Sequence, residues 1–398
     1  GVDWAAEQHS LLIEDERGLV LLEASFAHTE QGVGELCRLL VRRRVERVAL
    51  ERPDGLLVER LLDAGLTVLA LHPNQVKAAR ARFRAHGGKS DRFDAFVICE
   101  LCRTDAHRFR ALVPDTDETK ALRALTRGRE DLVEARVALA NQLRSELERC
   151  WPGAKQVFAE VDSPIALCFL ERYPTPEAAR CLGEKRLAAF LARQRYSGRK
   201  TAAELLERLR AAPTARAGSD EIEARRQIVL ALVSALKPLV ERIRELTSEI
   251  AHRLRAHPDG EIFRSLFRDP KSVVTAARLL AEIGDRRERY PTAEALAADG
   301  GMSAVAVESG KQTHAAFRYA CDKRLRDALA TLSDASRHHN PWAKRLYRDA
   351  CARGHDHPRA IRTVGRAWTR VLWRMWHDRA PYDPTRHRAL MRQITTGG

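Results

Sequence analysis

Four acidic residues near the start of the chain have the types and spacing that a metal-dependent nuclease needs. Asp3 lies at the end of an apolar start, and Glu51 ends the strand-like run 47–51. Asp91 and Asp94 stand three residues apart at the opening of a helical stretch, so they share one helix face. Carboxylates at strand ends that face a helix-borne pair can hold hard cations such as Mg²⁺ beside a phosphodiester. The four acids are therefore candidate catalytic residues and metal ligands.

The first hundred residues must position these acids, and their pattern alternates strand and helix. We expect three antiparallel strands, with a hairpin turn at 15–18, and a helix capped by Thr29. The order of three strands, helix, strand, helix, strand and helix predicts a ribonuclease-H-like (RuvC-like) α/β domain over residues 1–112. In such a sheet Asp3 and Glu51 meet at the centre, and divalent cations offset the repulsion among the carboxylates. The further elements expected are strands at 47–51 and 67–72 and helices at 29–44, 56–64, 74–82 and from 91.

The middle of the chain, residues 113–256, is expected to be a helical scaffold. Apolar residues recur at spacings of three, four and seven in 115–151 and again in 221–255, which predicts two long amphipathic helices. The two helices are expected to form either an antiparallel hairpin or an intermolecular coiled coil.

The last part, residues 257–398, is expected to be a mostly helical, basic domain. The whole chain has a net charge of +15, and from Gly310 onward it has 19 Lys and Arg against 7 Asp and no Glu. This charge favours a polyanionic partner, although a solvated surface or a membrane surface would also account for it. Arg362, Arg366 and Arg370 form a ladder at steps of four residues on the last long helix, a plausible phosphate-facing surface. A loop that begins at 300 and carries Ser309 is expected before the helix at 320–337.

The cysteines and the hydropathy pattern bound the environment of the protein. Eight cysteines are scattered without a disulfide framework, and the pair Cys99 and Cys102 falls inside a helical run without a second pair at zinc spacing. We therefore expect core thiols in a reducing bacterial cytoplasm, with no signal peptide and no membrane-spanning segment. The chain begins at Gly1 without Met, so we expect that some residues of the first strand precede it.

At these residues the chain resembles a known family over nearly its whole length. It resembles the insertion-sequence transposases that join an N-terminal RuvC-like DEDD domain to a C-terminal serine-bearing transposase domain, the bridge-RNA-guided recombinases. No single marker is specific, but their joint order and spacing are. The markers are GVDW (1–4), ALE (49–51), HPNQVK (72–77), GKSDRFDA (88–95), LLAEIGD (279–285), ESGK (308–311) and RGHDH (353–357).

The resemblance implies a chemistry. Asp3, Glu51, Asp91 and Asp94 would bind Mg²⁺, and Ser309 would attack a scissile DNA phosphate, leaving a phosphoserine link and a free 3′ hydroxyl. The partners implied are donor and target DNA, a structured guide RNA, and further copies of the chain in a homodimer or homotetramer. Lys311, His314 and Arg318 are placed to neutralise developing charge, and Lys89 is placed for a phosphate contact or a local ion pair.

The chain departs from the family's sequence pattern at two places, and two rival functions stay open. The family's helix-hairpin-helix turn is replaced by residues 268–272, and the expected proline after Gly301 is absent. Ser303 is a fallback nucleophile. One rival is a RuvC-like hydrolytic endonuclease acting on branched DNA, and the other is a non-catalytic nucleic-acid-binding protein derived from a transposon.

Overall fold

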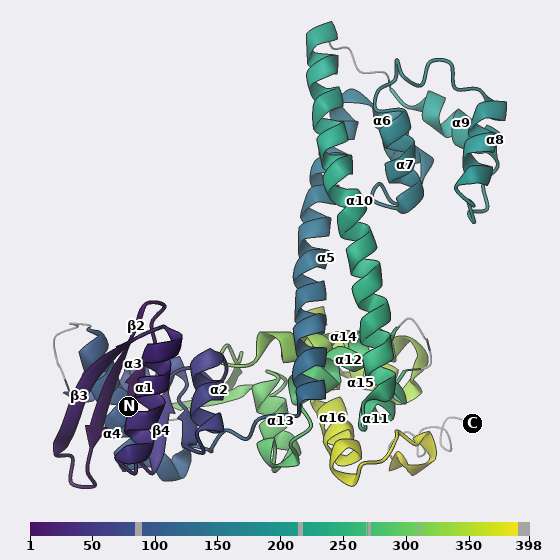
Figure 1. Ribbon diagram of the computed structural model, residues 1–398. Helices are drawn as coiled ribbons and strands as arrows, with labels where there is room; N and C mark the ends of the chain where they lie inside the picture. The colour runs from purple at the N-terminus through teal and green to yellow at the C-terminus, as the bar shows by residue number, and fades with distance from the viewer. Residues whose placement is uncertain (84–89, 214–217, 268, 270–271, 310–311, 389–398) are drawn as a thin grey trace. The chain divides into compact units, whose positions relative to one another are not determined.

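The computed structural model divides the chain into two compact units. Unit 1 comprises Gly1–Pro114 and unit 2 comprises Asp115–Gly398, so the expected helical middle and the expected C-terminal domain belong to one unit. The structure describes residues 1–83, 90–213, 218–267, 269, 272–309 and 312–388. Figure 1 shows strands only in the first unit and in one hairpin of the second, with helices elsewhere. The protein is mostly helical, with an N-terminal α/β unit.

Unit 1 begins with three antiparallel strands, as predicted. They are β1 (Val2–Asp3), β2 (Gln8–Glu14) and β3 (Val20–Ala27), in the order β1-β2-β3. The β2–β3 pairing joins Ser10 to Ser25 and shifts register next to the turn. The Asp15 carboxylate accepts hydrogen bonds from two backbone amides of that turn, those of Arg17 and Leu19, which fixes the connection.

The second half of the sheet region is parallel. Helix α1 (Glu30–Arg42) is capped by Thr29, whose hydroxyl accepts from the Gly32 amide, as expected. Strand β4 (Arg47–Leu50) then pairs in parallel with β5 (Thr67–Ala70), and α2 (Leu56–Asp63) connects them. Strand β4 also packs against β1, so the two strand groups share one core.

Two further helices complete unit 1. Helices α3 (Pro73–Phe83) and α4 (Asp91–Asp105) pack against each other, followed by the short η1 (Ala106–Arg108). Helix α4 lies against β1, β2 and β4 and buries Val97 and Ile98 in the core. This packing brings the first turn of α4 to the strand ends that carry the candidate acids.

An antiparallel helix pair organises unit 2. Helices α5 (Asp117–Cys150) and α10 (Ser219–Ala256) pack along each other within one chain, as the hairpin alternative predicted (Figure 1). Leu122 near the start of α5 shares a core with Leu254 near the end of α10. Leu143 and Val233 share a second core at the other end of the pair. The second core is completed by α6 (Pro152–Val157), α7 (Pro164–Arg172), α8 (Glu184–Arg193) and α9 (Ala202–Ala211).

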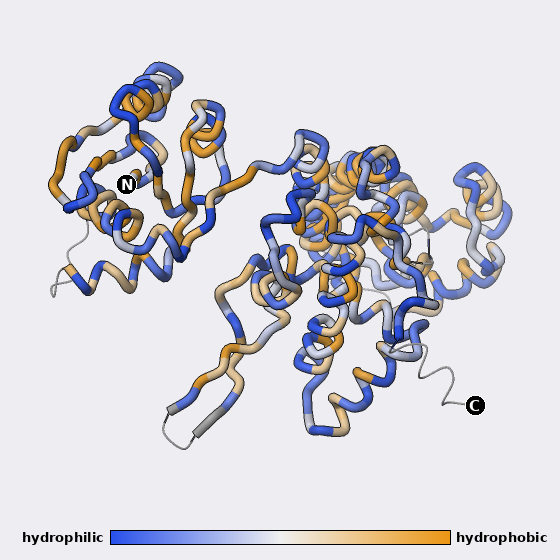
Figure 2. The backbone as a smooth tube through the Cα atoms, turned by 90° about the horizontal axis from the view of Figure 1, so that it is seen from below, coloured by the Kyte–Doolittle hydropathy of each residue, from blue (hydrophilic) through white to orange (hydrophobic). Residues whose placement is uncertain are grey.

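Among the described residues of the C-terminal part of unit 2, six α-helices pack on the first core. Trp368 and Trp376 of the last long helix are buried in it. In Figure 2 the hydrophobic segments gather inside each unit and the hydrophilic segments lie outside. The elements are α11 (Gly260–Arg264), α12 (Val273–Ile283), η3 (Arg287–Arg289), α13 (Ala293–Asp299), α14 (Lys323–His339), α15 (Pro341–Ala352) and α16 (His357–Asp378), with η4 (Pro384–Arg386) after them.

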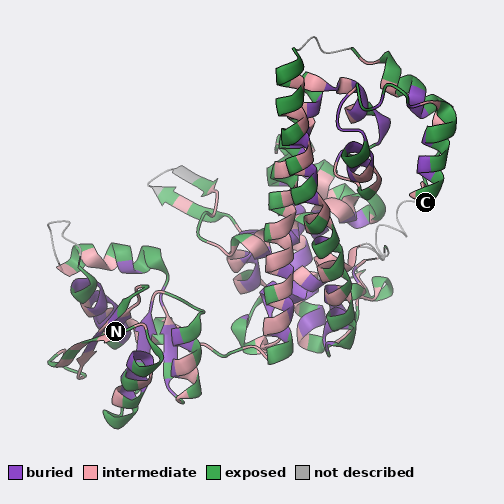
Figure 3. Ribbon diagram, turned by 45° about the horizontal axis from the view of Figure 1, so that its top comes forward, coloured by how far each residue is buried: buried purple, intermediate pink, exposed green. Residues whose placement is uncertain are grey.

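The expected loop around Ser309 is instead part of an antiparallel hairpin. Strand β6 (Val305–Ser309) pairs with β7 (Gln312–Ala316), with Val307 opposite His314. The alternation of Val305 and Val307 with Ala306 and Glu308 is a strand pattern, but so short a run has no buried face to make it recognisable. In Figure 3 the hairpin residues whose burial is described are mostly exposed, and the loop prediction was wrong.

The cysteines are free thiols, and those of the Cys99–Cys102 pair are buried in unit 1. Burial raises the pKa of each of these two thiols. Within the part of the chain that the structure describes, no helix is both long and apolar enough to cross a bilayer. Three residues of the turn at 268–272, namely Arg268, Pro270 and Lys271, lie outside the described residues.

Candidate active site

Two of the four candidate acids converge on one positive charge. The Arg80 Nε atom lies 2.6 Å from Asp94 Oδ1, and an Arg80 Nη atom lies 3.6 Å from Glu51 Oε1. The side chain of Asp94 is almost completely buried, at 2% exposure, whereas those of Arg80 and Glu51 are about a quarter exposed. A buried carboxylate is stable only when it is paired, so the guanidinium is its counter-ion.

The local sequence explains this placement. Strand β4 ends at the buried Leu50, which leaves Glu51 at the edge of the sheet region. Ser90 caps α4 by accepting a hydrogen bond from the Phe93 amide at 3.2 Å, so the helix begins at Asp91 and Asp94 falls in its first turn. A carboxylate in the first turn is also stabilised by the helix dipole.

Asp3 and Asp91 are near these elements but are not shown to join the pair. Asp3 is half-buried on β1, opposite Ser10, and β1 packs against both β4 and α4. Asp91 is exposed at the start of α4, whereas Asp94 is buried. Over residues 1–83, 90–213 and the other described ranges, no three His, Cys, Asp or Glu side chains form a group that could hold a metal ion. The four-carboxylate site therefore stays a prediction.

The donor chemistry of the observed pair fits a divalent cation. Glu51 and Asp94 place hard oxygen atoms against the same guanidinium group, and carboxylate oxygens are ligands that divalent cations such as Mg²⁺ prefer. Arg80 was missed by the sequence reasoning. The available signal was an arginine on the helix that immediately precedes the acidic pair in the chain.

The serine candidate lies on the β6–β7 hairpin of unit 2. Ser309 is the last residue of β6 and pairs in register with Gln312. Lys311 lies outside the described residues, and so does Lys89. Arg318, just after β7, donates from Nε to the Ser303 carbonyl at 3.0 Å, which ties the segment after the hairpin to the segment before it.

The arginine ladder on α16 is divided among three environments. Arg362 is half-buried, and its Cζ atom lies 4.8 Å from the centroid of the Phe317 ring. Arg366 is exposed, while Arg370 is exposed and lies 3.5 Å from Glu294. Residues four apart share a helix face, but contacts from other elements decide which members remain available to a ligand.

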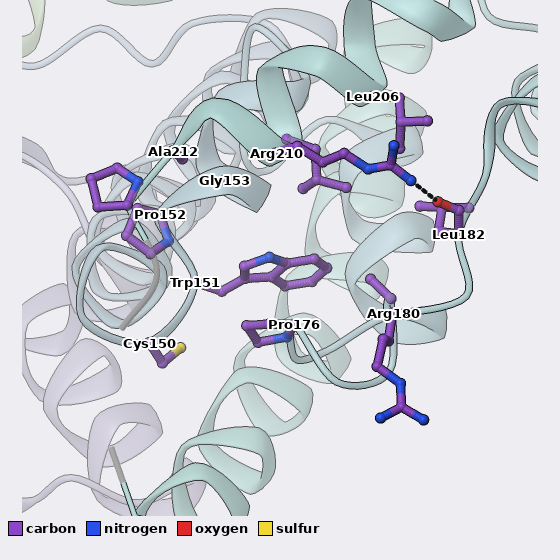
Figure 4. A pocket seen from close by; sticks show the side chains of 13 residues that line it. Cys150, Trp151, Pro152, Gly153, Pro176, Arg180, Leu182, Leu206, Arg210 and Ala212 are labelled. Atoms are coloured by element: carbon purple, nitrogen blue, oxygen red, sulfur yellow. Dashed lines mark hydrogen bonds between the residues drawn. The ribbon is translucent and has the colours of Figure 1, made fainter. Parts of the chain in front are cut away.

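A pocket in unit 2 is lined by none of the candidate site residues. It lies in the second core of unit 2 and has a volume of about 250 Å³ (Figure 4). The indole of Trp151 lies between Pro176 and Arg210 in this view, and Arg210 donates to the Leu182 carbonyl. Its lining contains no carboxylate. It therefore lacks the hard oxygen donors that a metal-dependent phosphoryl-transfer site requires.

Comparisons with known proteins assign the chain to a family. A DEDD-type family model described as a transposase matches residues 1–152, and a second, described as transposase of the IS116/IS110/IS902 family, matches residues 272–348. The protein assigned as the mini-circle transposase for IS117 of Streptomyces coelicolor is 31% identical, over 97% of this chain and 95% of its own length. The 44.8 kDa protein of insertion element IS116 from Streptomyces clavuligerus is 27% identical over 96% of both chains. The 42 kDa protein of insertion element IS900 from Mycobacterium paratuberculosis is 28% identical, again over 96% of both.

The chain therefore belongs to the IS110/IS116/IS902 family of insertion-sequence transposases. It is a DNA recombination enzyme, and its substrates are DNA. A DEDD transposase domain implies a divalent metal ion.

Proposed function

We propose that this transposase cuts and rejoins DNA strands through a covalent phosphoserine link formed by Ser309. The observation that carries the proposal is the convergence of Glu51 and Asp94 on one cationic group, in a domain of the DEDD type. Unit 1 would then be a ribonuclease-H-like domain, because its strand and helix order matches that fold and β4 packs beside β1.

The acids and the serine have separate roles in this proposal. Asp3, Glu51, Asp91 and Asp94 would hold Mg²⁺, which when bound supplies positive charge beside the phosphate and lowers the pKa of a nearby hydroxyl. The Ser309 oxygen forms a bond to phosphorus, and the bond from phosphorus to the 3′ oxygen breaks. The serine gives up its proton and the departing 3′ oxygen gains one, and the step reverses on a new partner strand.

A structured RNA is the proposed guide for donor and target choice. The net charge of +15 and the basic C-terminal part suit a polyanionic partner besides DNA. The proposal is tested by purifying the chain together with the transcript of the DNA that flanks its gene. Specific retention of a structured RNA supports guidance, and equal retention of a scrambled RNA of the same length contradicts it.

The covalent step is tested by trapping. We expect full-length protein, incubated with labelled donor DNA and Mg²⁺, to yield a denaturation-resistant protein–DNA adduct. Ser309→Ala removes the attacking oxygen, so the adduct should disappear. Ser303→Ala is the matched control, a serine in the same hairpin region that should leave the adduct unchanged. An adduct lost in Ser303→Ala and kept in Ser309→Ala would move the nucleophile to Ser303.

The same experiment separates the rival functions. If the DNA is cleaved without any adduct, and Ser309→Ala cleaves as well as wild type, the protein is a hydrolytic endonuclease that uses the acids alone. Asp94→Asn should abolish both cleavage and adduct, because it removes the charge of a buried carboxylate that is one of the proposed metal ligands. Binding without cleavage in wild type, with Mg²⁺ and the correct RNA present, would favour a non-catalytic binding protein.

A further inference from the structure

The base of the β6–β7 hairpin holds two guanidinium groups on one aromatic ring. The Cζ atoms of Arg326 and Arg362 lie 4.7 Å and 4.8 Å from the centroid of the Phe317 ring. Arg326 belongs to α14, Arg362 to α16, and Phe317 follows β7 directly. The attraction between each cation and the ring offsets part of the repulsion between the two cations.

The guanidinium of Arg326 is held in place by the residues that surround it. Gly301 has a φ of +62°, and a Cβ atom there would lie 2.5 Å from Arg326 Nε, so only glycine lets the side chain approach so closely. Arg326 also donates from Nη2 to the Arg318 carbonyl. Its side chain therefore has one defined orientation, with the glycine backbone and the Phe317 ring as neighbours.

Neither of these cations has an ion-paired carboxylate in the part of the chain that the structure describes. Within the ranges that the structure describes, neither Arg326 nor Arg362 forms an ion pair with a carboxylate, and the buried Nε of Arg326 has no hydrogen-bond partner. Burial lowers the pKa of Arg362; Asp356 opposes this, while the charges of Arg326 and Arg359 lower the pKa further. The Asp356 carboxylate already accepts a hydrogen bond from the Arg359 amide at the start of α16. Two adjacent guanidinium groups without an ion-paired carboxylate among the described residues are suited to a phosphate oxygen.

A large exposed aromatic side chain lies beside this pair. The ring of Tyr319 is perpendicular to that of Phe317, with centroids 4.7 Å apart, and Tyr319 is 80% exposed. Most of its surface is therefore open to solvent next to the two cations. An aromatic face beside phosphate-binding groups is the arrangement by which proteins bind unpaired bases.

We propose that Arg326, Arg362 and Tyr319 form a binding site for a single-stranded nucleic-acid segment. The two guanidinium groups contact a phosphodiester, and the exposed ring stacks on the adjacent unpaired base. A base in a duplex is stacked on both faces, so the duplex offers the arginines its phosphates but gives Tyr319 nothing to stack on. The site deepens the proposed recombination function by holding an opened strand near the hairpin that carries Ser309.

The test measures binding of labelled oligonucleotides of about 12 nucleotides to the full-length chain by fluorescence anisotropy. The probes are oligo-dT, oligo-U and a blunt DNA duplex of the same length. We expect Tyr319→Ala to weaken single-strand binding by about 5-fold to 150-fold, the range for loss of one stacked base, and to leave duplex binding within about 2-fold. Tyr319→Trp should retain single-strand affinity because it restores a stacking face.

Substitution of either arginine should change binding in a different way from substitution of Tyr319. Arg326→Gln and Arg362→Gln should weaken binding of all three probes and reduce the slope of log affinity against log salt by about one each. Arg374→Gln, an exposed arginine of α16 that pairs with Asp378, is the matched control and should change little. Circular dichroism and thermal melting establish that each variant is folded.

Unchanged single-strand binding in Tyr319→Ala, or an equal loss on single strands and duplex, would overturn the proposal. The oligo-dT and oligo-U arms show whether the strand bound is DNA, RNA or either. Adduct formation by Ser309 is a separate readout. Failure of the covalent mechanism would therefore leave the binding result standing, and failure of the binding site would leave the mechanism untouched.

Discussion

At the scale of single residues, an arginine decides how the candidate acids are arranged. Asp94 is buried and Glu51 is partly exposed, and both lie within ion-pair distance of Arg80. Without a cation at this position, two carboxylates would repel each other in a partly desolvated site. Arg80 therefore stabilises unit 1 where a divalent ion would also do so.

This balance predicts the behaviour of Arg80→Gln. We expect the substitution to lower the free energy of unfolding of unit 1 by about 1–3 kcal/mol, because it removes a charged hydrogen-bond partner of the buried Asp94. Millimolar Mg²⁺ should restore more stability to the variant than it adds to wild type. Hydrogen exchange of unit 1 peptides in urea measures both effects.

The matched control is Lys77→Gln, an exposed cation on the same helix, which should behave as wild type. An identical Mg²⁺ response in wild type and Arg80→Gln would contradict a metal position shared with Arg80.

At the scale of elements, the LLAEIGD segment has a structural role that its place among the family markers does not show. Arg127 of α5 binds Glu282 in α12 with two hydrogen bonds, at 2.9 Å and 2.6 Å. Asp285 accepts hydrogen bonds from the Thr119 hydroxyl at 2.8 Å and from Thr116, the N-cap of α5. Burial by itself would raise the pKa of Asp285. The pKa is nevertheless lowered, because these hydroxyl groups stabilise the charged form of the carboxylate. The segment therefore anchors the start of α5 in unit 2.

In unit 1, the carboxyl group of Glu14 makes the packing of β2 against α4 sensitive to pH. The pKa of Glu14 is raised from 4.5 to about 7, first by burial and then by the neighbouring Glu100, although the N-terminal ammonium group and Arg103, which lies 3.8 Å away, act in the opposite direction. Between pH 4.5 and 7 the folded state keeps a proton that the unfolded state releases. The stability contributed by this proton is full below pH 4.5 and is lost as the pH rises through 7.

We therefore expect unit 1 of wild type to be less stable at pH 8 than at pH 5, and Glu14→Gln to reduce that difference. Glu16→Gln, an exposed acid two residues away, should keep the wild-type pH dependence. Exchange of β2 and α4 peptides at the two pH values is the measurement. A pH dependence that is the same in Glu14→Gln and wild type would show that another group is responsible.

At the scale of the whole molecule, the two sets of candidate groups belong to different compact units. The acids lie in Gly1–Pro114, and Ser309 and the hairpin-base arginines lie in Asp115–Gly398. A reaction that needs both sets can draw them from one chain or from two copies. We propose a homodimer or homotetramer in which the acids of one protomer act with the serine of another.

Mixing two inactive variants tests this arrangement. Asp94→Asn and Ser309→Ala should each abolish adduct formation and strand joining. If the site combines two protomers, the mixed oligomers should recover a part of the wild-type activity, because some of them contain one intact set of acids and one intact serine. Native mass spectrometry monitors the exchange of subunits. If activity does not recover after the subunits have exchanged, both sets of groups act within a single chain.

Much of the fold follows from local patterns in the sequence. The Thr29 cap, the three antiparallel strands and the two long helices depend on hydrogen bonding and periodicity within short segments, and the structure confirms them. The order of the family markers also identified the family. The metal set, the serine's role and the RNA partner stay predictions, because no described contact tests them.

Sequence periodicity and capping determined the three antiparallel strands, the two long helices and which acids stand near a strand end or a helix start, but not the β6–β7 hairpin. Tertiary structure alone decided that Arg80 joins Glu51 to Asp94, that α5 and α10 pair within one chain, and that Arg326 and Arg362 meet at Phe317. The physical reason is how far apart along the chain the interacting residues are. Propensity and capping act over a few residues, whereas charge pairing and burial depend on which distant segments the core brings into contact.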